Sequence, residues 1–194
     1  MKYTDTPPYV PTLMESTRAI GYSIESAIAD IIDNSIAANA TTVDIDFFPI
    51  GEAYISILDN GYGMNETELI NAMKYGSQDP LQKRDEVDLG RYGLGMKTAS
   101  LSQCRILTVI SKKNGSVSAA QWNLDHIKSA GTWSLILLDE SDIARACSHK
   151  KSIKNHCKHN YRQKNRVQLI IASTNLSKTF DSEEKTFHLV SLFI

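Results

Sequence analysis

Three clusters of polar residues and glycines have types and spacings that suit phosphate or metal chemistry. In the first, Asp30 and Asn34 are four residues apart in a largely apolar stretch that also carries Asp33. On a helix, residues at this spacing project from one face. A carboxylate beside an amide oxygen suits a water molecule and Mg²⁺. The same pair is also common on ordinary solvent-facing helices, so both interpretations stay open at this point.

The second cluster follows a run of apolar residues that is typical of a buried strand. Asp59 comes at the end of that run, and Gly61 and Gly63 come directly after it. A carboxylate in this place can accept a hydrogen bond from an exocyclic amine such as that of adenine, and glycines let the backbone approach a ligand closely. Asp-Asn-Gly is also an ordinary turn sequence, so the pattern alone is evenly divided between a site and a turn.

The third cluster is a glycine-rich segment that leads into a predicted helix. Its members are Gly90, Gly93, Gly95, Lys97 and Thr98. Free N–H groups and the dipole at a helix N-terminus favour phosphate. The segment is not a P-loop, because Met96 separates Gly95 from Lys97 and no apolar strand precedes it. It is not a Rossmann fingerprint either, since its glycine order is G-x-x-G-x-G.

The elements that must position these clusters can be predicted from periodicity, caps and turn residues. Helices are expected over 13–19, 23–39, 65–75, 96–103 and 182–194, and strands over 41–48, 53–58, 105–112, 117–124, 133–138 and 166–172. Ser23 can cap the second helix, and Asn65 with Glu68 has the spacing of a capping box. The interleaved hairpins and helices predict an α+β fold, a two-layer sandwich with a mixed, mostly antiparallel sheet.

Length and composition favour a single globular domain. The chain has 194 residues, of which 42% are hydrophobic and 22% charged, with a net charge of −1, and this excludes collagen, coiled coils and wholesale disorder. We expect a proline-rich arm over 1–12, a domain over 13–194 and a long polar loop over 76–95. No apolar run approaches a membrane span, no secretory signal is visible and cysteines are few, so we expect a cytoplasmic protein without a membrane partner.

The charge is unevenly distributed along the chain. Residues 1–100 contain 7 Lys/Arg and 15 Asp/Glu, whereas residues 101–194 contain 14 and 7. Eight Lys/Arg and three His lie within residues 145–166, a basic stretch that can contact phosphates, although charge runs are more often solvated surfaces. Cys147, His149, His156, Cys157 and His159 lie close together. Their spacing departs from the usual zinc pattern, so we favour a basic surface over a zinc site.

The order and spacing of the three clusters are specific when they are taken together. The sequence resembles the GHKL superfamily of ATP-binding domains, which includes gyrase B subunits, ninety-kilodalton heat-shock chaperones, MutL and histidine kinases. The matching text is AIADIIDNSIAANA (27–40), DNGYGM (59–64) and GRYGLGMKTASLS (90–102). It is most similar to the MORC-like and bacterial branch, and the resemblance extends well over about residues 15–125. It implies a Bergerat-type ATP-binding fold.

The resemblance also implies a role for each matched residue. Asp30 is the catalytic residue that activates the hydrolytic water, Asn34 binds Mg²⁺, and Asp59 reads the adenine amine. The implied cofactor-binding set for ATP is Asn34, Asp59, Gly61, Gly63, Met64, Gly90, Gly93, Leu94, Gly95, Met96, Lys97 and Thr98. Residues 76–95 correspond to the family's ATP lid.

Two departures from the family pattern bear on activity. Asp30 is one methylene shorter than the family's glutamate, and a general base must reach its water, so we expect slow turnover. The family's late Gly-Thr is matched in text by Gly131-Thr132, but the strand count points to the strand over 166–172 instead. We therefore expect Mg-ATP binding with slow hydrolysis that drives lid closure or homodimerisation. The alternatives are a non-hydrolysing nucleotide sensor, and an ATPase that contacts DNA or a protein partner.

Overall fold

The computed structural model describes residues 2–19, 22–48, 54–75, 95–148 and 167–173. Within these residues the strands form one six-stranded sheet in the order β1-β2-β6-β3-β4-β5, and every neighbouring pair is antiparallel. The strands are β1 (Val43–Phe48), β2 (Tyr54–Asp59), β3 (Ile106–Lys113), β4 (Ser116–Asn123), β5 (Ile136–Leu137) and β6 (Val167–Ser173). The helices are α1 (Val10–Arg18), α2 (Ile24–Ala37), α3 (Glu66–Met73), α4 (Gly95–Gln103), α5 (Leu124–Ala130) and α6 (Glu140–Ser148).

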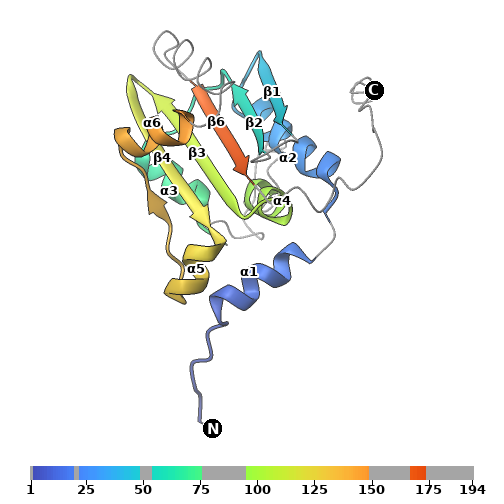
Figure 1. Ribbon diagram of the computed structural model, residues 1–194, viewed down its shortest axis with the longest axis vertical. Helices are drawn as coiled ribbons and strands as arrows, with labels where there is room; N and C mark the ends of the chain where they lie inside the picture. Colours follow the sequence, from blue (N-terminus) through green and yellow to red (C-terminus); the bar gives the residue numbers. More distant parts are fainter. Residues whose placement is uncertain (1, 20–21, 49–53, 76–94, 149–166, 174–194) are drawn as a thin grey trace.

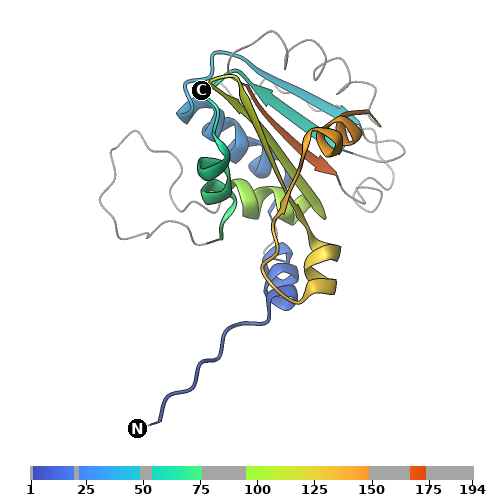
Figure 2. The same cartoon turned by 90° about the vertical axis from the view of Figure 1, so that its left-hand side faces the viewer.

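The helices and the sheet form two layers. Helices α2, α3 and α4 cover one face of the sheet, and α6 lies on the other side (Figures 1 and 2). Helices α1 and α5 lie next to each other at one end of the sheet. This arrangement confirms the predicted α+β two-layer sandwich. It places α2 and α4 side by side over the centre of the sheet, which is where the first and third clusters must meet.

The core lies between the sheet and the helix layer. It is built from apolar side chains of β2, β3 and β4 and from the inner faces of the helices, and its members include Met14, Ile31, Ile55, Ile57, Leu69, Met73, Leu101, Leu107, Val109 and Trp122. Leu69, Met73, Leu107 and Val109 are fully buried. Burial of such side chains stabilises a fold by about 1.5–3 kcal/mol each relative to exposure, so this layer fixes α3 against the sheet.

Local signals in the sequence correspond to the observed element boundaries. The Ser23 hydroxyl accepts a hydrogen bond from Ser26 N–H and caps α2, as predicted. Asn65 and Glu68 form the predicted capping box at the start of α3. Asn114 and Gly115 both have positive φ and connect β3 to β4, so the strands predicted over 105–112 and 117–124 form a hairpin.

The structure differs from the prediction at several elements. Helix α5 was not predicted, because its seven residues are too few for a clear helical period; Asn123 caps it and Gly131, at φ 68°, ends it. Strand β5 has two residues instead of six, and α1 begins at Val10, three residues before its predicted start. The predicted helix over 182–194 and most of the basic stretch lie outside the described residues.

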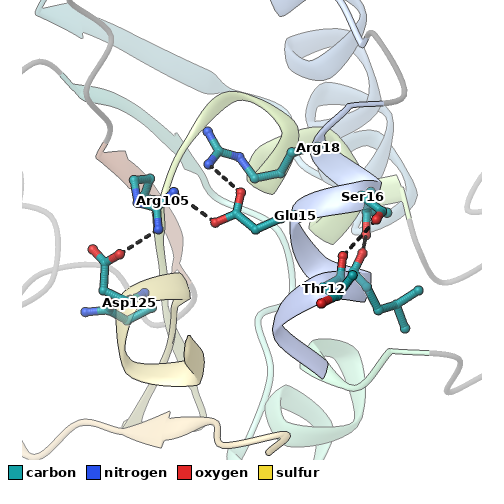
Figure 3. A network of polar contacts seen from close by, with 9 residues as sticks. Thr12, Glu15, Ser16, Arg18, Arg105 and Asp125 are labelled. Atoms are coloured by element: carbon teal, nitrogen blue, oxygen red, sulfur yellow. Dashed lines mark hydrogen bonds and ion pairs between the residues drawn. The ribbon is translucent and has the colours of Figure 1, made fainter. Parts of the chain in front are cut away.

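Ion pairs attach α1 to the end of the sheet. The Arg105 guanidinium lies between two carboxylates, with one nitrogen 3.1 Å from Glu15 of α1 and another bonded to Asp125 of α5 (Figure 3). Glu15 also pairs with Arg18 on its own helix. The two carboxylates raise the pKa of Arg105, so the guanidinium stays charged. Because α1 also buries Met14, both polar and apolar contacts hold this helix in place.

Candidate functional site

Helix α2 carries the first cluster on a face that is partly buried. The Asn34 amide nitrogen donates a 2.6 Å hydrogen bond to the carbonyl of Asp30, one turn earlier. This bond fixes the amide and leaves its oxygen free to accept a hydrogen bond or to bind a cation. The hydroxyl of Tyr22 donates to Oδ2 of Asp30, and the carbonyl of Tyr22 accepts from the Gln103 side chain of α4. The Asp30 carboxylate is therefore oriented by Tyr22, which precedes α2 and is itself bonded to α4.

Asp59 ends β2 as a buried carboxylate, only 4% exposed. Oδ1 accepts from the N–H of Gly61 at 2.8 Å, and Oδ2 lies 3.1 Å from the Ser35 hydroxyl of α2. Burial raises the pKa of Asp59, and the two hydrogen bonds oppose that rise. A carboxylate oxygen can accept more than one hydrogen bond, so Asp59 keeps acceptor capacity for a further donor.

The turn after Asp59 is packed so tightly that it requires glycine. A Cβ on Gly61 would lie 2.7 Å from the Ala38 methyl, and one on Gly63, where φ is +66°, would lie 2.2 Å from the Lys112 carbonyl oxygen. The N–H of Tyr62 donates to the Ala38 carbonyl, which ties the turn to the end of α2. These contacts explain the G-x-G spacing by close packing against α2 and β3.

The far end of the same turn is bonded to β3. The N–H of Met64 donates a 2.7 Å hydrogen bond to the hydroxyl of Ser111, which is fully buried. Two residues later α3 begins at its capping box, and Glu68 of that box also pairs with Lys113. The turn is thus held by α2, β3 and α3 together, and its backbone is fixed on every side.

The third cluster lies at the N-terminus of α4. The helix begins at Gly95, one residue before its predicted start, and it packs along α2. Met96 and Thr98 are partly buried in its first turn. Lys97 is 1% exposed, and its ammonium donates to the carbonyls of Ala72 and Lys74 at the end of α3, at 2.7 Å each. Gly90, Gly93 and Leu94 lie outside the described residues.

The structure therefore gathers the first two clusters around α2 and brings α4 against the same helix. Sequence reasoning missed several partners: the Tyr22 hydroxyl, the Ser35 hydroxyl, the Ser111 hydroxyl and the backbone carbonyls of Ala38 and Lys112. The position of Ser35, one residue after Asn34, was a usable signal, because the same helix turn must face the end of β2.

The residues present suit a magnesium nucleotide. The Asp30 carboxylate and the Asn34 amide oxygen are hard oxygen ligands of the kind that Mg²⁺ takes. The Asp59 carboxylate is buried and held by two donors, which suits recognition of an amine in a dry site. The N-terminal N–H groups of α4 add a site for negative charge on the neighbouring helix.

The comparison with protein families decides whether the three clusters form a nucleotide site or ordinary helix surfaces and turns. Residues 22–170 match the model of the histidine kinase-, DNA gyrase B-, and HSP90-like ATPases, which covers most of the chain. The chain belongs to this family. It is an ATP-binding domain of the GHKL type, and the resemblance predicted from the three clusters is confirmed.

Individual relatives agree with the MORC-like and MutL character of this GHKL domain. The chain is 34% identical over 95 residues to the ATPase morc-1 of Caenorhabditis elegans and 32% identical over 98 residues to the ATPase MORC2B of Mus musculus. It is 31% identical over 117 residues to the DNA mismatch repair protein MutL of Colwellia psychrerythraea. These alignments cover 48%, 47% and 58% of this chain but only 11%, 9% and 18% of the relatives, so the chain spans a small part of their length.

Gly131-Thr132 is the pair that matches the late Gly-Thr of the GHKL family in text. The textual Gly-Thr match does not open a strand: Gly131 is the left-handed residue that ends α5, and β6 is the strand that enters the middle of the sheet. This agrees with the strand count.

In the part of the chain that the structure describes, none of the helices combines the length and apolarity needed to cross a bilayer.

Proposed function

We propose that this GHKL domain binds Mg-ATP and hydrolyses it slowly. The observation that carries the proposal is the buried Asp59 carboxylate, which Ser35 and Gly61 hold against the end of α2. A buried carboxylate without an ion-pair partner in the described structure costs stability, because its charge is desolvated. A role in recognising an adenine amine explains why an acid stands at this position.

Under this proposal, each predicted site residue contacts either the adenine base or the phosphates and their Mg²⁺. Asp59 accepts from the adenine amine, while Gly61, Gly63 and Met64 shape the surface that receives the base. Asn34 supplies the amide oxygen for Mg²⁺, which would neutralise phosphate charge when bound. The segment from Gly90 to Thr98 is proposed to contact the phosphates through the glycines and the first turn of α4.

Asp30 is proposed as the residue that orients the attacking water. Its carboxylate is held by Tyr22, and Tyr22 is held by Gln103, so the base is fixed before nucleotide binds. Aspartate is one methylene shorter than glutamate, so its carboxylate reaches less far toward the attacking water. This favours slow turnover, and lid closure or dimerisation is the proposed output of the cycle.

The test is titration calorimetry of ATP, ADP and a non-hydrolysable ATP analogue with and without Mg²⁺, followed by a phosphate-release assay on the same protein. Asp30→Asn is the test variant and Asp33→Asn the matched control, since Asp33 is an exposed acid on the same helix. We expect Asp30→Asn to lower phosphate release at least about 100-fold with ATP affinity within about threefold of wild type. Asp33→Asn should release phosphate at the wild-type rate.

Each of the other outcomes would change or overturn the proposed function. Mg-ATP binding without phosphate release in the wild type would make the domain a nucleotide sensor. Equal release by wild type and Asp30→Asn would remove Asp30 from the mechanism. Absence of ATP binding under all conditions would overturn the proposed function as a whole.

A DNA partner is a second candidate, because the chain carries the basic stretch over 145–166 and relatives include proteins named for DNA mismatch repair.

Homodimerisation on ATP binding is proposed as an output of the cycle, as lid closure is. Sedimentation of the protein with and without the non-hydrolysable analogue tests it, and a nucleotide-independent monomer would exclude it.

A further inference from the structure

A buried lysine connects the two helices that flank residues 76–94 in the chain. Lys97 lies in the first turn of α4 and is 1% exposed. Its ammonium donates to the carbonyl oxygens of Ala72 and Lys74, both at 2.7 Å, and these carbonyls lie at the C-terminal end of α3. Burying a lysine is costly unless its donors are satisfied, so this contact must be specifically formed.

The same end of α3 is completed by a second side chain from elsewhere. The indole N–H of Trp122, in β4, donates to the carbonyl of Met73 at 2.9 Å. The last carbonyls of a helix have no partner within the helix. Here the carbonyls of Ala72, Met73 and Lys74 are all bonded by Lys97 and Trp122, where many helices use a glycine cap.

The next residue is held by aromatic packing. The Tyr75 ring lies 5.2 Å from that of Trp133 and 6.0 Å from that of Trp122, and the Lys97 ammonium is 6.0 Å from the centre of the Tyr75 ring. A cation near an aromatic face and at the negative end of a helix dipole is favourably placed. The exit of the chain from α3 is thus fixed by Lys97 of α4, Trp122 of β4 and Trp133 between α5 and β5.

We propose that Lys97 is a positioning residue: it holds the first turn of α4 against the end of α3 and so presents that turn to phosphate, rather than contacting phosphate itself. This rests on the proposed ATP-binding function. Two of the three ammonium donors are already used, and the side chain is buried on the α3 side of the helix. The geometry therefore differs from that of an exposed cation beside a phosphate.

Two properties separate positioning from a direct charge contact. A neutral lysine amine keeps two N–H groups, which is enough for the carbonyls of Ala72 and Lys74. Positioning therefore tolerates loss of the proton, whereas attraction to phosphate does not. Burial lowers the pKa of Lys97 to about 8, so the proton can be removed at accessible pH. The other titratable groups at this place are Tyr75 and the exposed ammonium of Lys74; Cys104 lies in the same core.

The experiment compares wild type with Lys97→Met, Lys97→Gln and the matched control Lys74→Met. Lys74 places its ammonium at the same helix end, but that group is exposed and bonds only to the Asn71 side chain among the described residues. ATP affinity is measured by calorimetry from pH 7.5 to 9.5, where the phosphates of ATP are fully ionised. Hydrogen–deuterium exchange of peptides from α3 is measured on the nucleotide-free proteins.

We expect Lys97→Met to weaken ATP binding about tenfold and to accelerate amide exchange at the end of α3 without nucleotide. Lys97→Gln keeps an uncharged donor one bond shorter, so it should recover part of both losses. Lys74→Met should match wild type. Wild-type affinity should stay level through pH 8.

Three results would overturn the assignment. Wild-type affinity that falls through pH 8, while that of Lys97→Met stays level, would show a direct charge contact. A direct charge contact would also follow if Lys97→Gln and Lys97→Met lost ATP affinity equally while amide exchange in α3 stayed at the wild-type rate in both variants. Wild-type ATP affinity in Lys97→Met would remove Lys97 from binding altogether. If wild type binds no ATP, the proposed function fails, and the exchange comparison still tests the α3 contact on its own.

Discussion

At the scale of single residues, burial disfavours the charged forms of two side chains at the candidate site, Asp59 and Lys97. Burial raises the pKa of the Asp59 carboxyl and lowers that of the Lys97 ammonium, and in each case the neutral form is favoured. Both groups are held by hydrogen bonds to backbone groups of the turn after β2 or the end of α3. Such groups cost stability and are typical of functional sites.

Asp59→Asn should weaken ATP binding while leaving the fold intact. An asparagine oxygen can still accept from Gly61 N–H, and its amide can donate to the Ser35 hydroxyl, which also lies 3.2 Å from the Ile31 carbonyl. The lost acceptor charge should reduce affinity by about 1.5–3 kcal/mol, which is roughly 10- to 150-fold. Calorimetry measures the affinity, and circular dichroism controls for folding. Unchanged ATP affinity would exclude Asp59 from adenine recognition.

The same variant predicts a pH dependence of stability. The folded pKa of Asp59 lies above its ordinary value, so the folded state binds more protons than the unfolded state between the two values. The wild type therefore gains stability from this group as pH falls through the folded pKa. At neutral pH, Asp59→Asn should melt at or above the wild-type temperature, and this advantage should shrink as pH falls toward 4. An advantage that grows on acidification would contradict the raised pKa.

At the scale of elements, the turn between β2 and α3 is held by close contacts and hydrogen bonds to α2 and β3. Gly63→Ala should be strongly destabilising, because a Cβ would lie 2.2 Å from the Lys112 carbonyl oxygen and φ is positive. Gly115→Ala is the matched control, since it shares a positive φ but has no atom within 4 Å of the added Cβ. We expect about 1–2 kcal/mol for Gly115→Ala and at least about 2 kcal/mol more for Gly63→Ala in urea unfolding. Equal losses would mean that backbone strain alone accounts for both.

Elements set by local chemistry could be predicted from the sequence. The Ser23 cap, the Asn65–Glu68 capping box and the Asn114-Gly115 turn each act over at most four residues, so the text contains the whole interaction. Helix α5 was missed because its seven residues show no clear period. The mostly antiparallel sheet was predicted as a class, but the place of β6 between β2 and β3 depends on pairing with residues more than a hundred positions away in β2 and more than fifty positions away in β3.

The candidate site shows the same division. The spacing of Asp30, Asn34 and Asp59 within family motifs was enough to predict the nucleotide-binding fold. The bonds that orient these groups join residues far apart: Tyr22 to Asp30, Ser35 to Asp59 and Met64 to Ser111. Lys97 was predicted near phosphate because it follows a glycine-rich segment. Its burial against α3 depends on how two helices pack, which spacing does not reveal.

At the scale of the whole molecule, the basic stretch over 145–166 gives the chain a charge asymmetry that a polyanion can use. If it contacts DNA, affinity should fall steeply with salt, with a slope of log affinity against log salt of about −0.9 per phosphate contact. Fluorescence anisotropy with duplex DNA from 50 to 300 mM salt measures this slope. Replacing Lys150, Lys151 and Lys154 with glutamine should reduce the slope by about 2–3. A slope near zero would exclude this partner.

The position of β6 has a consequence for how the protein is synthesised. A strand completed at residue 173 joins the pairs β1-β2 and β3-β4, which are complete by residue 123. Until β6 arrives, each of β2 and β3 has an unpaired edge whose backbone groups can join another chain. In a nascent or truncated chain that ends before residue 167, the two hairpins would therefore each keep an unpaired strand edge that can associate with another chain. The ribosome must synthesise β6 before the helices of the ATP-binding domain can pack on a continuous sheet.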